Sequence, residues 1–349
     1  MGFGVEFGQP AIMAEGLAEA AVHTGWMGDL LLPAEKLAKE HASKGEPPKS
    51  LIELLELSQK NEKLVHSAEP GDGNKLRDGV IARAGYEMAE LAGHYYLQPP
   101  AKSEKEANQY LEEKVAEMTN LCAYFTVTAQ RPPHRVKFDF FHIHDLNSTI
   151  FFPAFLLGEN ASWLSLEEKC RLLEWKARGD LAQYVARGSA KLDMKEIDEY
   201  VPNVKSDQKV QSGARGAEST HEEEQGWDSL FTRIIQHEDD GHASKVVRAL
   251  AHAEQICNKY TDGSKSLDWK IKTQKQWLTA GHMAVDSVED AEGPDWVRSC
   301  GFESAWEKVC TALPVVLYFA NAFQGRSKEQ SASWWKERKG SAFARVRAA

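Results

Sequence analysis

Apolar residues recur along most of this chain at the three-to-four-residue spacing of one face of an α-helix. The pattern is clearest in four segments: 12–21, 166–184, 246–257 and 302–313. Pro10 stands where it can open the first of these helices. Alternating patterns typical of strands are rare, the best being 123–128 and 136–140. The spacing predicts an all-α protein, built as a single large multi-helix domain with long loops.

Three stretches interrupt the helical pattern: 66–79, 98–101 and 201–226, the last being rich in Ser, Gly, Lys and Glu. The helices on both sides of 201–226 look alike, which favours a loop excursion from one helical body over a linker between two domains. We therefore expect a helical domain over 1–324 and a basic C-terminal tail over 325–349. That tail has seven basic and two acidic residues, which favours a solvated end over an interaction with a membrane surface or an acidic partner.

The overall charge is acidic, with 52 Asp and Glu against 42 Lys and Arg. This balance argues against nucleic-acid binding, whose affinity comes from cations that neutralise phosphates. No apolar run approaches the ~20 residues of a transmembrane helix. No basic residue precedes Lys36, so a secretory signal is not expected. The five scattered cysteines contain no C-x-x-C pair and predict reduced thiols in a cytoplasmic protein.

Two familiar motifs fail on spacing. His237 and His242 are five residues apart, whereas a zinc-protease helix needs them four apart to share a face. Gly71-Asp-Gly73 lacks the third glycine of a dinucleotide fingerprint. A nucleotide-dependent enzyme of familiar type is therefore not expected, although a nicotinamide cofactor bound without a fingerprint stays open.

Two other segments concentrate histidine beside acids. One holds His142 and His144 in an aromatic run, and the other runs from Asp239 through His242 to Lys245. Neutral imidazoles from two segments can bind one ion, and a nearby carboxylate such as Asp139 or Asp145 can orient the His144 ring. Each residue also has a simpler reading, as a packed histidine, a helix cap or a solvated charge. An acid at 239 or 240 suits a helix start.

The motifs together resemble those of the fungal questin oxidase-like family. They are the opening Gly2-Phe-Gly-Val-Glu-Phe, Asp139-Phe-Phe-x-x-His, Phe151-Phe-Pro, Tyr184-Val-Ala-Arg-Gly-Ser and Asp240-Gly-His-Ala-Ser-Lys. The resemblance implies an oxidoreductase that tailors an anthraquinone-like polyketide with O2, by Baeyer–Villiger-type oxygen insertion or ring cleavage. It also implies Fe(II) in one branch of the family and NADPH in some members.

Carried over to this chain, the resemblance implies His144 and His242 as metal ligands and Lys245 as a candidate carboxylated lysine. Asp139, Asp145 and Asp240 would lie outside the ligand set and orient the ligands by hydrogen bonds. An apolar substrate pocket would be lined by four aromatic residues, which are also typical core residues: Phe140, Phe141, Phe151 and Phe152.

One departure from the family concerns the ligand set. In the family a histidine precedes the opening motif and further histidine motifs lie upstream, whereas this chain begins at Met1 inside that motif. If those upstream histidines supply ligands, this polypeptide lacks part of the metal shell. Two alternatives follow: a catalytically silent helical binding protein, or an NADPH-dependent oxidase without metal.

Overall fold

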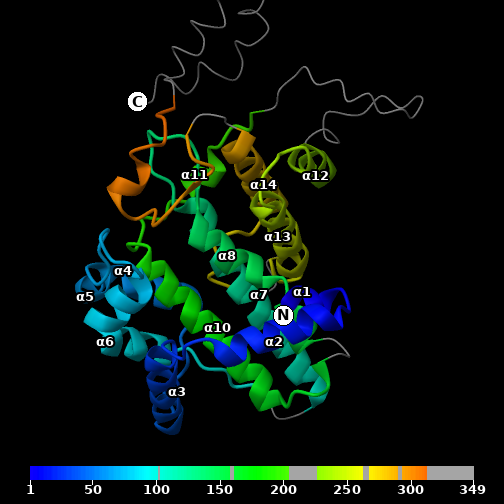
Figure 1. Ribbon diagram of the computed structural model, residues 1–349. Coiled ribbons are helices and arrows are strands. Elements are labelled where there is room, and N and C mark those ends of the chain that lie inside the picture. Colours follow the sequence, from blue (N-terminus) through cyan, green and yellow to red (C-terminus); the bar gives the residue numbers. More distant parts are fainter. Residues whose placement is uncertain (101–102, 158–160, 204–225, 262–266, 290–292, 313–349) are drawn as a thin grey trace, which may run out of the picture. The chain divides into compact units, whose positions relative to one another are not determined.

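The computed structural model describes residues 1–100, 103–157, 161–203, 226–261, 267–289 and 293–312 (Figure 1). Residues 1–310 form one compact unit, and helices dominate it, which confirms the all-α prediction. Most of the predicted excursion over 201–226, and all of the predicted tail over 325–349, lie outside the described residues. None of the described helices is both long and apolar enough to span a membrane.

The N-terminal part is a group of short helices. They are α1 (Gly2–Glu6), α2 (Pro10–Val22), α3 (Gly28–Ser43), α4 (Leu51–Lys60), α5 (Glu62–Val65), the π-helix η1 (Lys75–Ile81) and α6 (Ala82–Gly93). Pro10 opens α2, as the sequence predicts. Ser50 and Glu53 form a reciprocal capping box at the start of α4. Among these helices, α3 packs extensively on α6.

Two long helices carry the middle of the fold: α7 (Glu104–Thr128) and α10 (Leu166–Ala186). Between them come β1 (Phe138–Asp139), α8 (Phe140–Thr149) and α9 (Phe152–Leu156). The strand-like run 123–128 is the end of α7, where every residue is buried. A helix covered on all faces shows no amphipathic period, so the sequence pattern there was misleading. β1 pairs in parallel with β2 (Trp296–Val297), far along the chain.

The C-terminal helices are α11 (Lys195–Asp198), α12 (Trp227–Ile235), α13 (His242–Cys257), the 3-10 helix η4 (Asn258–Tyr260), α14 (Gln274–Glu289) and the 3-10 helix η5 (Glu303–Trp306). The helix predicted over 302–313 is wrong within the described residues, since only η5 forms there. Trp306, the last residue of η5, is buried, and its indole Nε1 donates a hydrogen bond to the Cys300 carbonyl, 2.8 Å away. The short turn therefore buries this aromatic residue without a longer helix.

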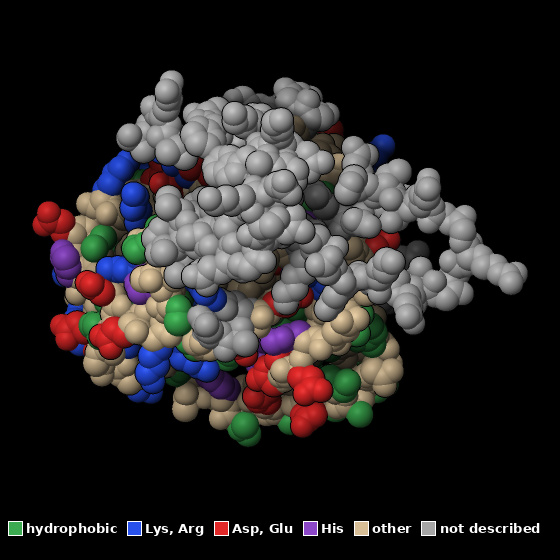
Figure 2. All heavy atoms as spheres, turned by 90° about the horizontal axis from the view of Figure 1, so that it is seen from above, with side chains coloured by type: hydrophobic (Ala, Val, Ile, Leu, Met, Phe, Trp, Pro, Cys, Tyr) green, Lys and Arg blue, Asp and Glu red, His purple; other side chains and the backbone are tan. Residues whose placement is uncertain are grey.

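The main hydrophobic core draws on helices from α3 to α14. Four of the five cysteines are buried and all five are free, as expected for reduced thiols. On the described part of the face drawn in Figure 2, acidic and basic side chains are interspersed.

Candidate active site

His144 and His242 lie side by side, although 98 positions separate them in the sequence. Their ring centroids are 5.0 Å apart and the rings are nearly perpendicular, at 84°. His144 projects from the middle of α8, and His242 is the first residue of α13. The packing of α13 on α8 brings the two rings together.

Two aspartates fix the helix starts that aim these rings. Asp139 accepts hydrogen bonds from the backbone N–H groups of Phe141 (2.8 Å) and His142 (3.3 Å), and so caps α8. At α13 the N-cap is Gly241, and Asp239 accepts hydrogen bonds from the N–H groups of Gly241 and of Ala243 in the first helical turn, both at 2.8 Å. These bonds satisfy orphan donors of the first helical turn.

Lys245 lies one turn along α13 from His242. Its side chain folds back toward Gly241, such that a Cβ on that glycine would lie 3.8 Å from Lys245 Nζ. His144 is exposed at the surface, but partial burial of its ring lowers its pKa, and the neighbouring His242 and Lys245 lower it further. The neutral imidazole is the form that binds a metal, so the surroundings favour the ligand form of His144.

The three aspartates of the predicted surroundings have different partners. Asp240 hydrogen-bonds to His242 Nδ1, which lowers the pKa of the Asp240 carboxyl. The ring's second nitrogen, Nε2, is then the one that can bind a metal. Asp139 caps α8 and also accepts a hydrogen bond from the Cys300 N–H, 2.7 Å away. Asp145 is held in a buried group with Lys176, where burial and Asp180 raise its pKa well above the usual range.

Phe140 connects the imidazole pair to a nearby cation. Its ring centroid is 4.8 Å from that of His144 and 5.1 Å from that of His242, and the Arg298 guanidinium lies 3.9 Å from the Phe140 centroid. Phe141 packs edge-on against Phe140, with ring centroids 5.7 Å apart, and the Arg187 guanidinium covers its ring at 4.0 Å.

Phe151 and Phe152 are half-buried around the start of α9, with Phe151 packed edge-on against Phe3 at 4.8 Å. His142 is a core residue. Its ring packs 4.7 Å from that of Phe125, and burial lowers its pKa to about 4.

A cavity of about 510 Å³ adjoins this region. Its walls combine flat apolar groups with cations, including Trp26, Phe141, Phe302, Lys75, Arg187 and Arg298. Arg298 therefore contacts Phe140 on one side and lines the cavity on the other. Sequence reasoning found Phe141 but missed the cations, because Lys75, Arg187 and Arg298 come from three distant segments with no shared motif.

The cavity holds a buried cation with spare hydrogen-bonding capacity. Arg187 is 4% exposed, and its Nε has no hydrogen-bond partner among the described residues. Burial, together with the charge of Arg187, lowers the pKa of Lys75. Asp72, which also lines the cavity, acts in the opposite direction on Lys75. With Arg187 and Arg298, the cavity wall has three cations and can accept an anionic ligand.

The residues at the imidazole pair fit part of a metal shell. Two imidazoles supply nitrogen donors, and Asp240 orients one of them. Oxygen donation from Lys245 requires the carbamate, since an ammonium has no lone pair. With it, the set becomes the mixed N/O donor set that suits non-haem iron.

Residues 1–250 match the model of a family described as questin oxidase-like. A Baeyer-Villiger monooxygenase, dmxR6 of Cryptosporiopsis sp., is 38% identical over 313 residues, covering 88% of this chain and 63% of that protein. Baeyer-Villiger oxidase ptaJ of Pestalotiopsis fici is 36% identical over 312 residues, with coverage of 88% and 63%. Questin oxidase of Aspergillus fumigatus is 33% identical over 314 residues, again with 88% and 63%. The chain thus spans 63% of the length of these relatives.

Proposed function

The chain belongs to the questin oxidase-like family, and from that premise we propose that it is an oxidoreductase acting on an aromatic polyketide of anthraquinone type. The reaction is O2-dependent and takes place at a non-haem iron site. It is either ring cleavage that takes up both oxygen atoms, or oxygen insertion of Baeyer–Villiger type, in which NADPH supplies the two electrons that reduce the second oxygen atom to water. The observation that carries the proposal is the pairing of His144 with His242 at 5.0 Å, beside Lys245 and next to a cation-lined aromatic cavity.

In this proposal His144, His242 and carboxylated Lys245 hold the iron as part of its ligand shell. Carbamate formation joins a neutral Lys245 amine to CO2 and releases one proton, which turns an amine into an anionic oxygen donor. Bound iron supplies the redox chemistry needed with O2. Asp240 holds the His242 ring by its Nδ1, a contact that sets ring orientation and raises ligand basicity.

The cavity is the proposed substrate pocket. Trp26, Phe141 and Phe302 offer apolar faces for a flat ring system, as ligand pockets commonly do. Arg187 and Arg298 can donate charge-assisted hydrogen bonds to a phenolate, carboxylate or carbonyl oxygen of the substrate. Because Arg298 also stacks on Phe140, a ligand bound to it lies next to the ring that contacts both imidazoles.

Iron uptake tests the metal part of the proposal. Untagged protein is reconstituted anaerobically with Fe(II), and bound iron is measured by elemental analysis. We expect wild type and the control His23→Ala, an exposed residue at the end of α2, to bind similar iron. His144→Ala and His242→Ala should each bind one equivalent of iron less than wild type. Equal iron in all four proteins would remove the metal site.

The carbamate has its own spectroscopic test. Protein incubated with ¹³C-bicarbonate should show a carbamate carbon resonance that is absent from Lys245→Arg, since a guanidinium does not form this adduct. A resonance that persists in the variant would place the modification elsewhere, and no resonance in either protein would exclude it.

Turnover distinguishes the oxidase from its rivals. We expect O2 consumption with a hydroxylated anthraquinone, assayed with NADPH supplied as reductant, that is abolished by iron chelators. NADPH-dependent turnover that tolerates chelators would instead support a metal-free oxidase, and ligand binding without O2 consumption would support a silent binding protein.

A further inference from the structure

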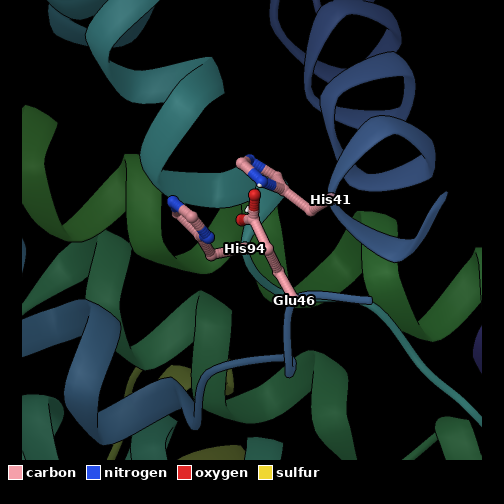
Figure 3. Close-up of side chains that lie close together, drawn as sticks. All are labelled: His41, Glu46 and His94. Carbon is pink, nitrogen blue, oxygen red and sulfur yellow. Dashed lines mark hydrogen bonds and ion pairs between the residues drawn. The ribbon is translucent and has the colours of Figure 1, made fainter. Parts of the chain in front are cut away.

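A second group of metal-ligating side chains lies outside the imidazole pair of α8 and α13. His41, Glu46 and His94 each place a ligand atom such that all three atoms lie within 4.8 Å of one another. Figure 3 shows the Glu46 carboxylate pointing between the two imidazole rings. The rings are stacked with centroids 4.0 Å apart, and His41 Nδ1 is 2.6 Å from Glu46 Oε2.

The backbone at the end of α3 places Glu46 over His41. Gly45 adopts a left-handed conformation, with φ of +72°, and the chain turns back on the helix there. The Glu46 N–H donates to the His41 carbonyl (3.2 Å), and the Gly45 N–H donates to the Ala42 carbonyl (3.0 Å). These two bonds make a Schellman motif, which fixes the residue after the glycine above the last helical turn.

The end of α6 is held against the same place by close packing. A Cβ on Gly93 would lie 2.9 Å from Leu37 Cβ and 3.2 Å from the Ala34 carbonyl, so the two helices approach closely only because this residue is glycine. His94 follows directly and stacks on His41. The Lys49 N–H donates to the His94 carbonyl at 3.0 Å, which joins the loop after α3 to the end of α6.

We propose that His41, Glu46 and His94 bind a divalent transition-metal ion, with Zn²⁺ the best fit. Two imidazoles and one carboxylate form a common three-residue ligand set for zinc, which leaves a fourth position for water. The buried Nε2 of His41 has no hydrogen-bond partner among the described residues. Either ring nitrogen can therefore serve as the metal-binding atom, Nε2 or the Nδ1 that faces Glu46.

Ion binding replaces the His41–Glu46 hydrogen bond by two bonds to the metal, and the two rings tilt out of their stack so that their lone pairs converge. The ligands come from the end of α3, the loop after it and the end of α6, so the ion would cross-link two helices through their C-termini. This site shares no residue with the proposed iron shell.

The test is a Zn²⁺ titration of the full-length chain by calorimetry, in a His144→Ala/His242→Ala background that removes the other imidazole pair. We expect one Zn²⁺ per chain. Loss of an outer partner of a metal ligand commonly costs 10–100-fold in affinity, so removal of a ligand in His41→Ala or His94→Ala should cost about 100-fold or more. The control His23→Ala should bind zinc as the parent does.

A second measurement covers the case in which the background variant does not fold. In the wild-type chain, His41→Ala and His94→Ala should each lower zinc uptake by one equivalent, with an unchanged circular dichroism spectrum. No saturable uptake in the parent, or equal affinity after both substitutions, would show a hydrogen-bonded contact only. Either result leaves the proposed iron site untouched, because His144 and His242 play no part in the proposed zinc site.

Discussion

At the scale of single residues, Arg298 has the most informative position. It is an exposed side chain that lines the cavity and stacks on Phe140, which in turn contacts His144 and His242. A cation so placed can bind an anionic oxygen of a ligand and hold the adjoining ring near the imidazoles. Arg187 contributes a second, buried guanidinium to the same cavity.

Replacement of this cation should weaken ligand binding. We expect Arg298→Ala to bind a hydroxyanthraquinone carboxylate about 10-fold more weakly, since a hydrogen bond to a charged group contributes about 1.5–3 kcal/mol and solvent screens this exposed one. Calorimetric titration measures the change. Arg77→Ala, which removes an exposed arginine paired with Asp78 outside the cavity, should bind as wild type does. Equal affinity of both variants would exclude Arg298 from binding.

Gly301 lies between Ser299 and Phe302, which line the cavity, and must be glycine because two segments of backbone are in contact there. A Cβ on Gly301 would collide with the carbonyl of Gly188 and lie 2.7 Å from the Arg187 carbonyl oxygen. Backbone atoms cannot rotate away as side chains do. Gly188 itself has a φ of +89°, so its chain is already fixed in a conformation that favours glycine.

We expect Gly301→Ala to lower the free energy of unfolding by about 2–3 kcal/mol, as overpacking commonly does. Urea unfolding followed by circular dichroism measures this. Gly179→Ala is the matched control, because it lies inside α10 with no atom within 4 Å of its Cβ position. It should be neutral or stabilising by up to about 1 kcal/mol. A loss of the same size in both variants would contradict the steric explanation.

At the scale of elements, Glu35 joins α3 to α10. Its carboxylate accepts hydrogen bonds from Arg171 Nε at 2.9 Å and Trp175 Nε1 at 3.0 Å, and pairs with Lys39 on its own helix at 3.0 Å. Burial acts to raise the pKa of this carboxyl, but the three hydrogen bonds outweigh it and lower the pKa to about 2. The charged Glu35 carboxylate therefore helps to hold α3, the helix that carries His41, against α10.

The contribution of Glu35 should depend on pH. Its folded pKa of about 2 lies below the unfolded value of 4.5, so its stabilisation is complete above about pH 4.5 and is lost as the pH falls toward 2. We expect Glu35→Gln to be less stable by about 1 kcal/mol at pH 7, a figure reduced for solvent screening. Urea unfolding at pH 7 and pH 3 should show the gap between the two proteins closing.

The exposed Glu19→Gln in α2 is the control for Glu35 and should match wild type at both pH values. A gap of constant size from pH 7 to pH 3 would show that lost packing, and not lost charge, destabilises the Glu35 variant.

At the scale of the whole molecule, one connected core joins the N-terminal helices to α13 and α14. Met88 in α6 and Leu250 in α13 are both fully buried members of it. The larger of the two core clusters in the described residues spans residues 30–288. It should unfold as one cooperative unit, because neither half retains its packing alone.

We therefore expect Met88→Ala and Leu250→Ala to shift the same unfolding transition, each by about 2–5 kcal/mol. Tryptophan fluorescence and circular dichroism, recorded together in a urea titration, should give coincident curves for wild type and both variants. Two separate transitions, each sensitive to only one substitution, would show two folding units within residues 1–310.

The sequence by itself determined the helical class, the starts of α2 and α13, and the family, because these depend on local spacing, capping chemistry and motifs. It did not determine that only the short 3-10 helix η5 forms within 302–312, where a longer helix was predicted. Nor did it determine that 123–128 is helical, since burial on all sides hides the period. Only the tertiary structure decided that His144 meets His242, that Lys75, Arg187 and Arg298 share a cavity, and that His94 stacks on His41. Each depends on helix packing between distant segments, and packing is a property of whole surfaces that no short stretch of sequence encodes.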